Sequence, residues 1–157
     1  MTIEIYETPP ADFIPQMYTA ACYLEVAGKV LLVQRAPHKS EPGKWGVPAG
    51  KLDPGETPGE AAVRELFEET GIRAQVRSLG ALYMRLPKLS YVYSIFQVLL
   101  DHQPEVYLSD ENTNYCWASN ADLEKLVLMP GAPEGLAYFR SKNKPQRHRG
   151  KRGSTEG

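Results

Sequence analysis

One segment of the chain carries signals for both ends of a helix. Thr57 is placed to cap the N-terminus, Pro58 suits the first helical position, and Glu60 completes a T-x-x-E capping box. Gly71 suits the left-handed residue that follows a helix. The sequence therefore predicts a helix over residues 58–70, with an apolar face that must pack against other elements. The residues of that face are Ala62, Val63, Leu66 and Phe67.

Three carboxylates share another face of the predicted helix, because Glu65, Glu68 and Glu69 stand at positions i, i+3 and i+4. They occupy its last turns, where like charges and the negative end of the helix dipole each cost up to about 1 kcal/mol. An acidic helix face is usually only solvated, and for these three residues alone that interpretation stays open. A hard divalent cation such as Mg²⁺ would instead turn the repulsion into a binding site.

Apolar runs predict a β framework around this helix. Two runs flank Ala27-Gly28 as a hairpin, and Pro and Gly residues mark a structured loop before the helix. Mixed strands with two or three helices indicate an α/β fold, and the chain length suits one domain. The expected strands are 17–26, 29–35, 45–47, 73–86, 91–100 and 115–118, with a short helix over 121–126. The expected organisation is an irregular or edge-strand lead-in over 1–16, a domain over 17–140 and a disordered basic tail over 141–157.

Charge is distributed unevenly along the chain. The formal net charge is -1, but seven bases lie in the last eighteen residues. When those seven bases and the single acid of the stretch, Glu156, are left out, the chain has 11 bases and 18 acids. This excess of acids suits a protein that handles cations. The basic tail is able to hold a polyanion such as RNA, and it equally suits a role in solubility alone.

Cysteine usage and the first residues bear on the compartment. Cys22 and Cys116 lie in strand-like apolar stretches without metal-ligand spacing, which predicts buried thiols rather than a disulfide framework. The first residues, MTIEIYETPP, carry acids where a secretory leader carries bases, and no apolar run has the length of a membrane span. We therefore expect a cytoplasmic protein with no membrane partner.

The stretch GKLDPGETPGEAAVRELFEETGI, Gly50 to Ile72, resembles the Nudix box. That pattern is G, five residues, E, seven residues, R-E-U-x-E-E-x-G-U, where U is aliphatic. The resemblance extends over Met17 to Phe139, and one departure is Ala49, where many relatives have a second glycine. It implies the Nudix fold, an α/β/α sandwich with a mixed central sheet. All nine constrained positions match: Gly50, Glu56, Arg64, Glu65, Leu66, Glu68, Glu69, Gly71 and Ile72.

The resemblance implies an enzyme that splits a pyrophosphate bond by attack of water on phosphorus, with Mg²⁺ as cofactor and Mn²⁺ as a substitute. Arg64, counted among the catalytic residues, and Glu56 would orient the metal ligands from the helix and the loop. Which carboxylate takes the proton from water stays open. The implied metal-binding residues are Gly50, through its carbonyl, and Glu65, Glu68 and Glu69.

Three further residues are candidates on the same resemblance. Glu111 resembles the loop glutamate that some members use as an extra ligand or base, although Asp110 competes for that role and a plain surface acid also accounts for it. Arg35 and Lys51 are placed to bind phosphate oxygens of the substrate, or else are solvated charges. Some aromatic residues are able to stack on a nucleobase or to belong to the core. These are Tyr18, Trp45, Tyr83 and Tyr91.

The box encodes the shared chemistry only, so the substrate stays open between the nucleotide-sugar or ADP-ribose type and a nucleoside triphosphate. Pro87, fifteen residues past Ile72, resembles the downstream proline of ADP-ribose pyrophosphatases, but a proline that ends a strand accounts for it as well. One alternative is an RNA 5′-end pyrophosphohydrolase that uses the basic tail. Another is a domain that senses a nucleotide without hydrolysing it. The complete set of three carboxylates argues against this alternative. A homodimer also stays open.

Overall fold

The computed structural model describes residues 2–143 of the chain. No helix in this part is both long enough and apolar enough to span a bilayer. The elements follow one another as β1 (Glu4–Tyr6), β2 (Met17–Val26), β3 (Lys29–Arg35), β4 (Trp45–Gly46), β5 (Ala49–Lys51), α1 (Pro58–Thr70), β6 (Val76–Leu86), β7 (Leu89–Val98), β8 (Asn112–Ala118), α2 (Asn120–Leu123) and α3 (Ala132–Lys142).

The strands form one mixed sheet, in the order β1-β6-β7-β2-β3-β4, with β5 also paired to β2 and β8 to β3. Strand β2 pairs in parallel with β7, and the remaining strand pairs are antiparallel. The first part of β2 pairs with β7 and β5, whereas its last two residues pair with β3. β2 therefore joins the two halves of the sheet.

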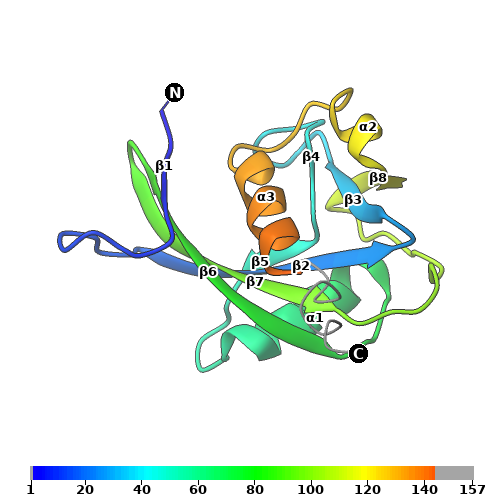
Figure 1. Ribbon diagram of the computed structural model, residues 1–157, viewed down its shortest axis with the longest axis horizontal. Helices are drawn as coiled ribbons and strands as arrows, with labels where there is room; N and C mark the ends of the chain where they lie inside the picture. The colour runs from blue at the N-terminus through cyan, green and yellow to red at the C-terminus, as the bar shows by residue number, and fades with distance from the viewer. Residues whose placement is uncertain (1, 144–157) are drawn as a thin grey trace, which may run out of the picture.

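Helices cover both faces of the sheet (Figure 1). Leu66 of α1 packs with Cys22 on one face. Phe139 of α3 packs with Tyr23 on the other face. Consecutive residues of β2 thus point into different layers, as the two-residue period of a strand requires. The predicted α/β fold with a mixed central sheet between helical layers is confirmed.

Helix α1 begins and ends at the predicted residues. The Thr57 hydroxyl accepts a hydrogen bond from the Glu60 amide at 3.1 Å, and the Glu60 carboxylate accepts one from the Thr57 amide at 2.9 Å. Gly71 has a φ of 74° and donates its amide hydrogen to the Phe67 carbonyl. These local contacts fix where the acidic residues of the helix lie relative to the sheet.

Several short elements differ from the predicted ones. Strand β8 begins at Asn112 rather than Tyr115, because its polar first residues pair with the end of β3. β5 occupies a stretch predicted as loop, because it pairs with β2. Helix α2 ends at Leu123 rather than Leu126. Strand β1 pairs with β6 at the sheet edge, which agrees with the edge-strand alternative predicted for the lead-in. Pairing with a distant strand, rather than an apolar pattern, makes these residues extended.

Helix α3 has no counterpart among the predicted elements, and its composition explains why. Its second turn contains Gly135, a poor helix former, and its N-cap makes no side-chain hydrogen bond. Gly135 is nevertheless needed, because a Cβ there would overlap the Tyr23 hydroxyl and lie 3.4 Å from the Tyr93 ring. Phe139 stacks on the Tyr23 ring at 5.0 Å. The tail predicted for 141–157 starts inside this helix, and residues 144–157 lie outside the described part.

Both cysteines are free thiols, as predicted. Cys22 is buried and donates its Sγ hydrogen to the Ala62 carbonyl at 3.2 Å, which links β2 to α1. Cys116 is half-buried on β8.

The two helical glycines give a matched test of the packing under α3. We expect Gly135→Ala to lower the free energy of unfolding by about 1–2 kcal/mol, because the overlap with Tyr23 outweighs the gain in helix propensity. Gly59→Ala in α1 should raise it by roughly 0.5 kcal/mol. There, the atom nearest to an added Cβ is Phe96 Cε2 at an ordinary 3.8 Å. Urea unfolding of both variants checks this, and equal effects would contradict the close packing of α3.

Candidate active site

Arg64 of α1 ties the preceding loop to the acidic face of the helix. Its guanidinium donates to both oxygens of Glu56, at 2.6 and 2.9 Å, and to the Lys51 carbonyl at 3.0 Å. Its Nη1 donates to Glu65 at 3.0 Å and to Glu68 at 3.1 Å. The hydrogen bonds from Arg64 and from the loop backbone lower the pKa of the Glu56 carboxyl to about 2. The Arg64 guanidinium thus holds three carboxylates and the loop backbone in place.

Glu69 is the buried acid of this helix, with 5% of its surface exposed. Burial raises its pKa well above the usual value, and the hydrogen bond with Glu65 and the charge of that residue raise it further. Asn112 donates to Glu69 Oε1 at 3.4 Å, which acts in the opposite sense. Over residues 2–143 no basic side chain forms an ion pair with Glu69. Glu65 is partly exposed and accepts from Arg64, so it is Glu69, the buried member of this carboxyl pair, that requires a proton shared with Glu65 or a cation.

Gly50 brings the backbone of β5 against the Glu65 carboxylate. A Cβ at residue 50 would overlap the carboxyl carbon and both oxygens of Glu65. The position of Gly50 is fixed by its pairing with Ala20 of β2. The absence of a side chain at this position is what allows the strand and the acid to lie together.

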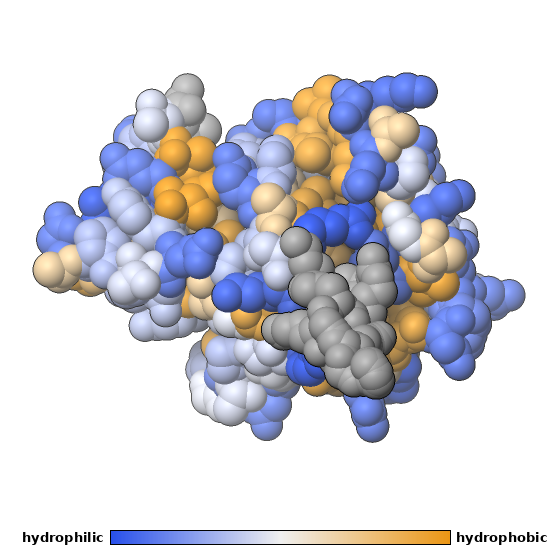
Figure 2. Space-filling model, viewed as in Figure 1, coloured by the Kyte–Doolittle hydropathy of each residue, from blue (hydrophilic) through white to orange (hydrophobic). Residues whose placement is uncertain are grey.

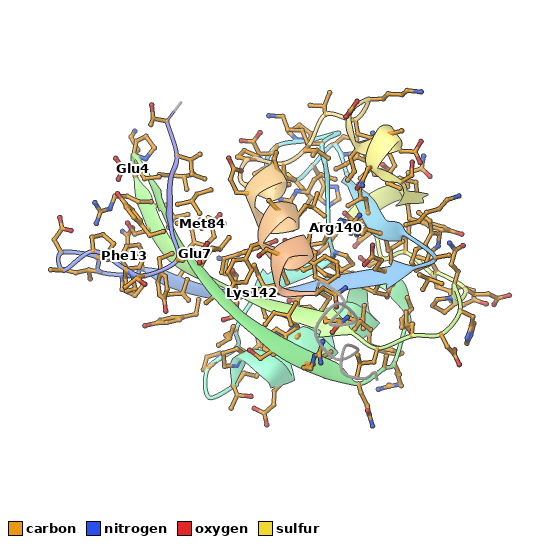
Figure 3. The ribbon with its side chains drawn as sticks, viewed as in Figure 1. Glu4, Glu7, Phe13, Met84, Arg140 and Lys142 are labelled. Carbon is orange, nitrogen blue, oxygen red and sulfur yellow. The ribbon has the colours of Figure 1, made fainter. Side chains whose placement is uncertain are left out.

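A cavity of about 790 Å³ lies beside these acids. One part is acidic and includes Glu65 and Glu69, and the β3–β4 loop adds basic residues to its wall. The other part lies between the β6–β7 hairpin and α3, and Figure 2 shows apolar surface on both sides of the notch there. Met84 lies on the side of β6 that faces α3 (Figure 3). The apolar residues of this part include Met84, Leu86, Leu89, Met129, Pro130 and Leu136.

Most residues singled out from the sequence meet at this cavity. Glu68 does not line it: its side chain is 55% exposed and pairs with Arg64. Arg64 and Glu56 lie behind the wall as supports of the loop. In the described chain no three His, Cys, Asp or Glu side chains are already grouped around a metal position. The singled-out residues that line the cavity are Arg35, Gly50, Lys51, Glu65, Glu69 and Glu111.

The β3–β4 loop supplies a residue that sequence analysis missed. Arg35 folds onto its own loop, because its guanidinium donates to the carbonyl and the hydroxyl of Ser40 at 3.0 and 2.9 Å. Lys39 of the same loop reaches the cavity, with its Nζ 3.7 Å from Glu111 Oε2. The Ala36 amide also donates to the Glu111 carbonyl at 3.0 Å. The only sequence signal for Lys39 was its place in a polar loop directly after a strand.

Aromatic residues of the cavity also differ from those expected. Of the four aromatic residues named from the sequence, Tyr91 lines the cavity, whereas Tyr18, Trp45 and Tyr83 do not. Tyr23 and Tyr93, from the adjacent strands β2 and β7, line it instead. Pro87 lies outside both strands, in the turn between β6 and β7.

Comparisons with known proteins agree with this architecture. The NUDIX domain family matches residues 15–139. A Bacillus subtilis (strain 168) protein named "Putative 8-oxo-dGTP diphosphatase" is 40% identical over 128 residues, which cover 80% of this chain and 82% of that protein. The crystal structure of the MutT protein from Methanosarcina mazei Go1 is 25% identical, with a TM-score of 0.72, and covers 87% of this chain and 100% of that one.

The Nudix domain of Shewanella oneidensis NrtR, crystallised with ADP-ribose, has the same TM-score of 0.72. It is 23% identical and covers 87% of this chain and 94% of that one, which shows the shared fold. The matched family, the relative from Bacillus subtilis and the complete box lead to one conclusion. The chain belongs to the Nudix family, and it is a Nudix hydrolase.

Proposed function

We propose that this hydrolase cleaves a nucleoside triphosphate into a nucleoside monophosphate and pyrophosphate, with Mg²⁺ as its cofactor. The observation that carries the proposal is the carboxyl pair of Glu65 and Glu69 at the acidic part of the cavity, whose buried member, Glu69, has no basic partner in the described chain. The triphosphate class is supported by the name of the Bacillus subtilis relative, which refers to 8-oxo-dGTP. The cavity is large enough for a nucleotide, at about 790 Å³.

The residues present fit a hard divalent cation. The buried pair supplies carboxylate oxygens, and Gly50 brings backbone oxygen-bearing groups next to them. Mg²⁺ prefers such oxygen ligands, and a cation in place of a shared proton would relieve the repulsion between the two acids. When bound, a divalent ion supplies neutralisation of phosphate charge and acidification of water. We assign Gly50, Glu65 and Glu69 to hold it.

Glu68 belongs to the same ligand set in this proposal, although it does not line the cavity. It accepts from the same Arg64 Nη1 as Glu65, so the two carboxylates lie close together. Its exposed side chain has room to turn toward the cavity. Arg64 and Glu56 act through position, since they hold the helix and the loop in register.

Glu111 is our candidate for the group that takes the proton from the attacking water. It lines the cavity, its negative charge contributes to the raised pKa of Glu69, and its side chain is 48% exposed. Its half-exposed carboxylate is accessible to water in the cavity. Lys39 lies close enough to steady Glu111 and, with Lys51, to bind phosphate oxygens. Arg35 contributes by ordering the loop that presents Lys39.

The other functions considered have less support. The basic tail that would hold RNA falls mostly in residues 144–157, outside the described part. A domain that senses a nucleotide without cutting it has no use for a buried acid pair, which costs stability unless a proton or cation neutralises it. We therefore prefer hydrolysis of a nucleoside triphosphate to these alternatives.

The Glu69→Gln variant tests the assignment of the buried acid. Turnover should fall by about 10²–10⁴-fold, because an amide removes a charged oxygen ligand from the pair. Glu124→Gln, an exposed glutamate beyond helix α2, is the matched control and should keep wild-type turnover. Far-ultraviolet circular dichroism should be the same for both proteins. Normal turnover in Glu69→Gln would remove this residue from the site.

Metal dependence is tested by chelation. We expect EDTA to abolish hydrolysis, and Mg²⁺ or Mn²⁺ to restore it. A readout that does not depend on activity is thermal unfolding, because a ligand that binds the folded state raises the melting temperature. Mg²⁺ should raise it for the wild type and much less for Glu69→Gln. Undiminished hydrolysis in chelator would refute the cofactor assignment.

A substrate panel tests the chemical class. Ordinary and oxidised nucleoside triphosphates should be cleaved at least about tenfold more efficiently than ADP-ribose, nucleotide sugars and triphosphorylated RNA, with pyrophosphate as the second product. A tenfold ratio corresponds to about 1.4 kcal/mol of transition-state discrimination. The substrate class is decided by the value of kcat/KM for each compound, and the release of pyrophosphate is measured separately. Preference for ADP-ribose or a nucleotide sugar would replace the triphosphate proposal.

A further inference from the structure

Two tyrosine hydroxyls meet between the sheet and helix α3. Tyr23 and Tyr93 come from the adjacent parallel strands β2 and β7. Tyr93 lies opposite Thr19, four residues before Tyr23, and the two side chains bring their hydroxyl oxygens to within 2.9 Å of each other. Tyr23 is 1% exposed, and its ring is fixed against Phe139 of α3. Gly135 of α3 leaves the space that the Tyr23 hydroxyl fills. Both tyrosines line the cavity beside α3.

The two hydroxyls of this pair have one more donor proton than they use in hydrogen bonds within the described chain. Each hydroxyl carries one proton, and one of the two protons is used in the bond between them. The other has no acceptor among the residues that the structure describes, since the mutual bond is the sole one formed by either hydroxyl there. Burial raises the pKa of both tyrosines, so both keep their protons. A buried donor without a partner costs about 1–3 kcal/mol, so this proton calls for an acceptor from the cavity.

The surroundings restrict what that acceptor is. The side chains of the same core cluster that line the cavity are largely apolar and include Met84 and Leu136; Tyr91 adds a hydroxyl but no charge. An ionised phosphate would be desolvated there without a cation, which is unfavourable. A flat, neutral ring with a polar edge fits, because apolar walls accept its faces and the hydroxyl meets its edge. The donor is deeply recessed, so an oxygen that projects from the ring reaches it more easily than a nitrogen within the ring.

We propose that the Tyr23–Tyr93 hydroxyl pair is a specificity site that donates a hydrogen bond to the carbonyl oxygen of the substrate's nucleobase. The carbonyl is the one on the edge farthest from the sugar, at purine C6 or pyrimidine C4, since that edge enters the cavity first. The inference rests on the proposed function, because it takes the cavity as the place where a nucleotide binds. The pair acts on affinity and discrimination, and it takes no part in the cleavage step.

Binding of nucleoside monophosphates tests this pair, because they contain no phosphoanhydride bond and are not turned over. Inosine monophosphate is compared with purine riboside monophosphate, and uridine monophosphate with zebularine monophosphate. The second member of each couple lacks the carbonyl. Isothermal titration calorimetry on the full chain in Mg²⁺ should show about three- to tenfold tighter binding of the carbonyl-bearing member in at least one couple, the range of one neutral hydrogen bond.

The preference should fall to near one in the double variant Tyr23→Phe/Tyr93→Phe, because neither hydroxyl then remains to donate to the carbonyl. Tyr138→Phe is the matched control: its hydroxyl donates to the Leu79 carbonyl at 2.8 Å and does not line the cavity, so the preference should persist. The double variant Tyr23→Phe/Tyr93→Phe removes both hydroxyls, so no unpaired partner remains to unfold the protein. Thermal melting confirms that each variant is folded.

Three results would overturn the inference. They are equal affinity within both couples for the wild type, no binding of any of the four compounds, and equal weakening of both members of a couple in the variants. The last would mean that the hydroxyls support the fold or hold a water molecule. Because binding is read without hydrolysis, a chain that fails to cleave triphosphates but keeps the carbonyl preference would refute the proposed function and leave this inference intact.

Discussion

Strand β2 is the constraint on which the rest of the structure depends, because it is buried on both faces and its neighbouring residues serve different layers. Cys22 faces α1 and is bonded to that helix, while Tyr23 faces α3 and borders the cavity. The same strand pairs with β5, which places Gly50 against Glu65, and with β7, whose Tyr93 hydroxyl reaches that of Tyr23. A shift of β2 by one residue would exchange the two layers and separate both groups.

Electrostatics within α1 are shared between one cation and several acids. Arg64 neutralises the acids on the outer side, including Glu56 and Glu68, and leaves Glu69 without a basic partner within the described chain. This division is the physical reason that the inner acids fit a divalent ion. The buried Glu69 carboxyl, unpaired among the described residues, lowers the stability of this end of the helix, and such a cost is typical of a functional site.

Our two proposals place chemistry and selection in different parts of the cavity. The acids belong to the box helix and its loop, which the local sequence specifies, whereas Tyr23 and Tyr93 come from strands seventy residues apart. The Gly135 gap on α3 then makes room for their hydroxyls. Substrate preference is therefore able to change through the strands and α3 without disturbing the carboxylates. Such a separation would explain physically why the same Nudix box occurs in enzymes that act on different substrates.

By itself the sequence determined helix α1, both its caps, the shared face of Glu65, Glu68 and Glu69, and the α/β class, because these depend on contacts between residues a few positions apart. Tertiary structure alone decided that Glu69 is buried while Glu68 is exposed, and that Arg35 folds onto its loop while Lys39 reaches Glu111. It also decided that α3 forms despite Gly135 and an N-cap without a side-chain hydrogen bond. Such outcomes depend on partners far away in the chain, and strand pairing and packing override local propensity there.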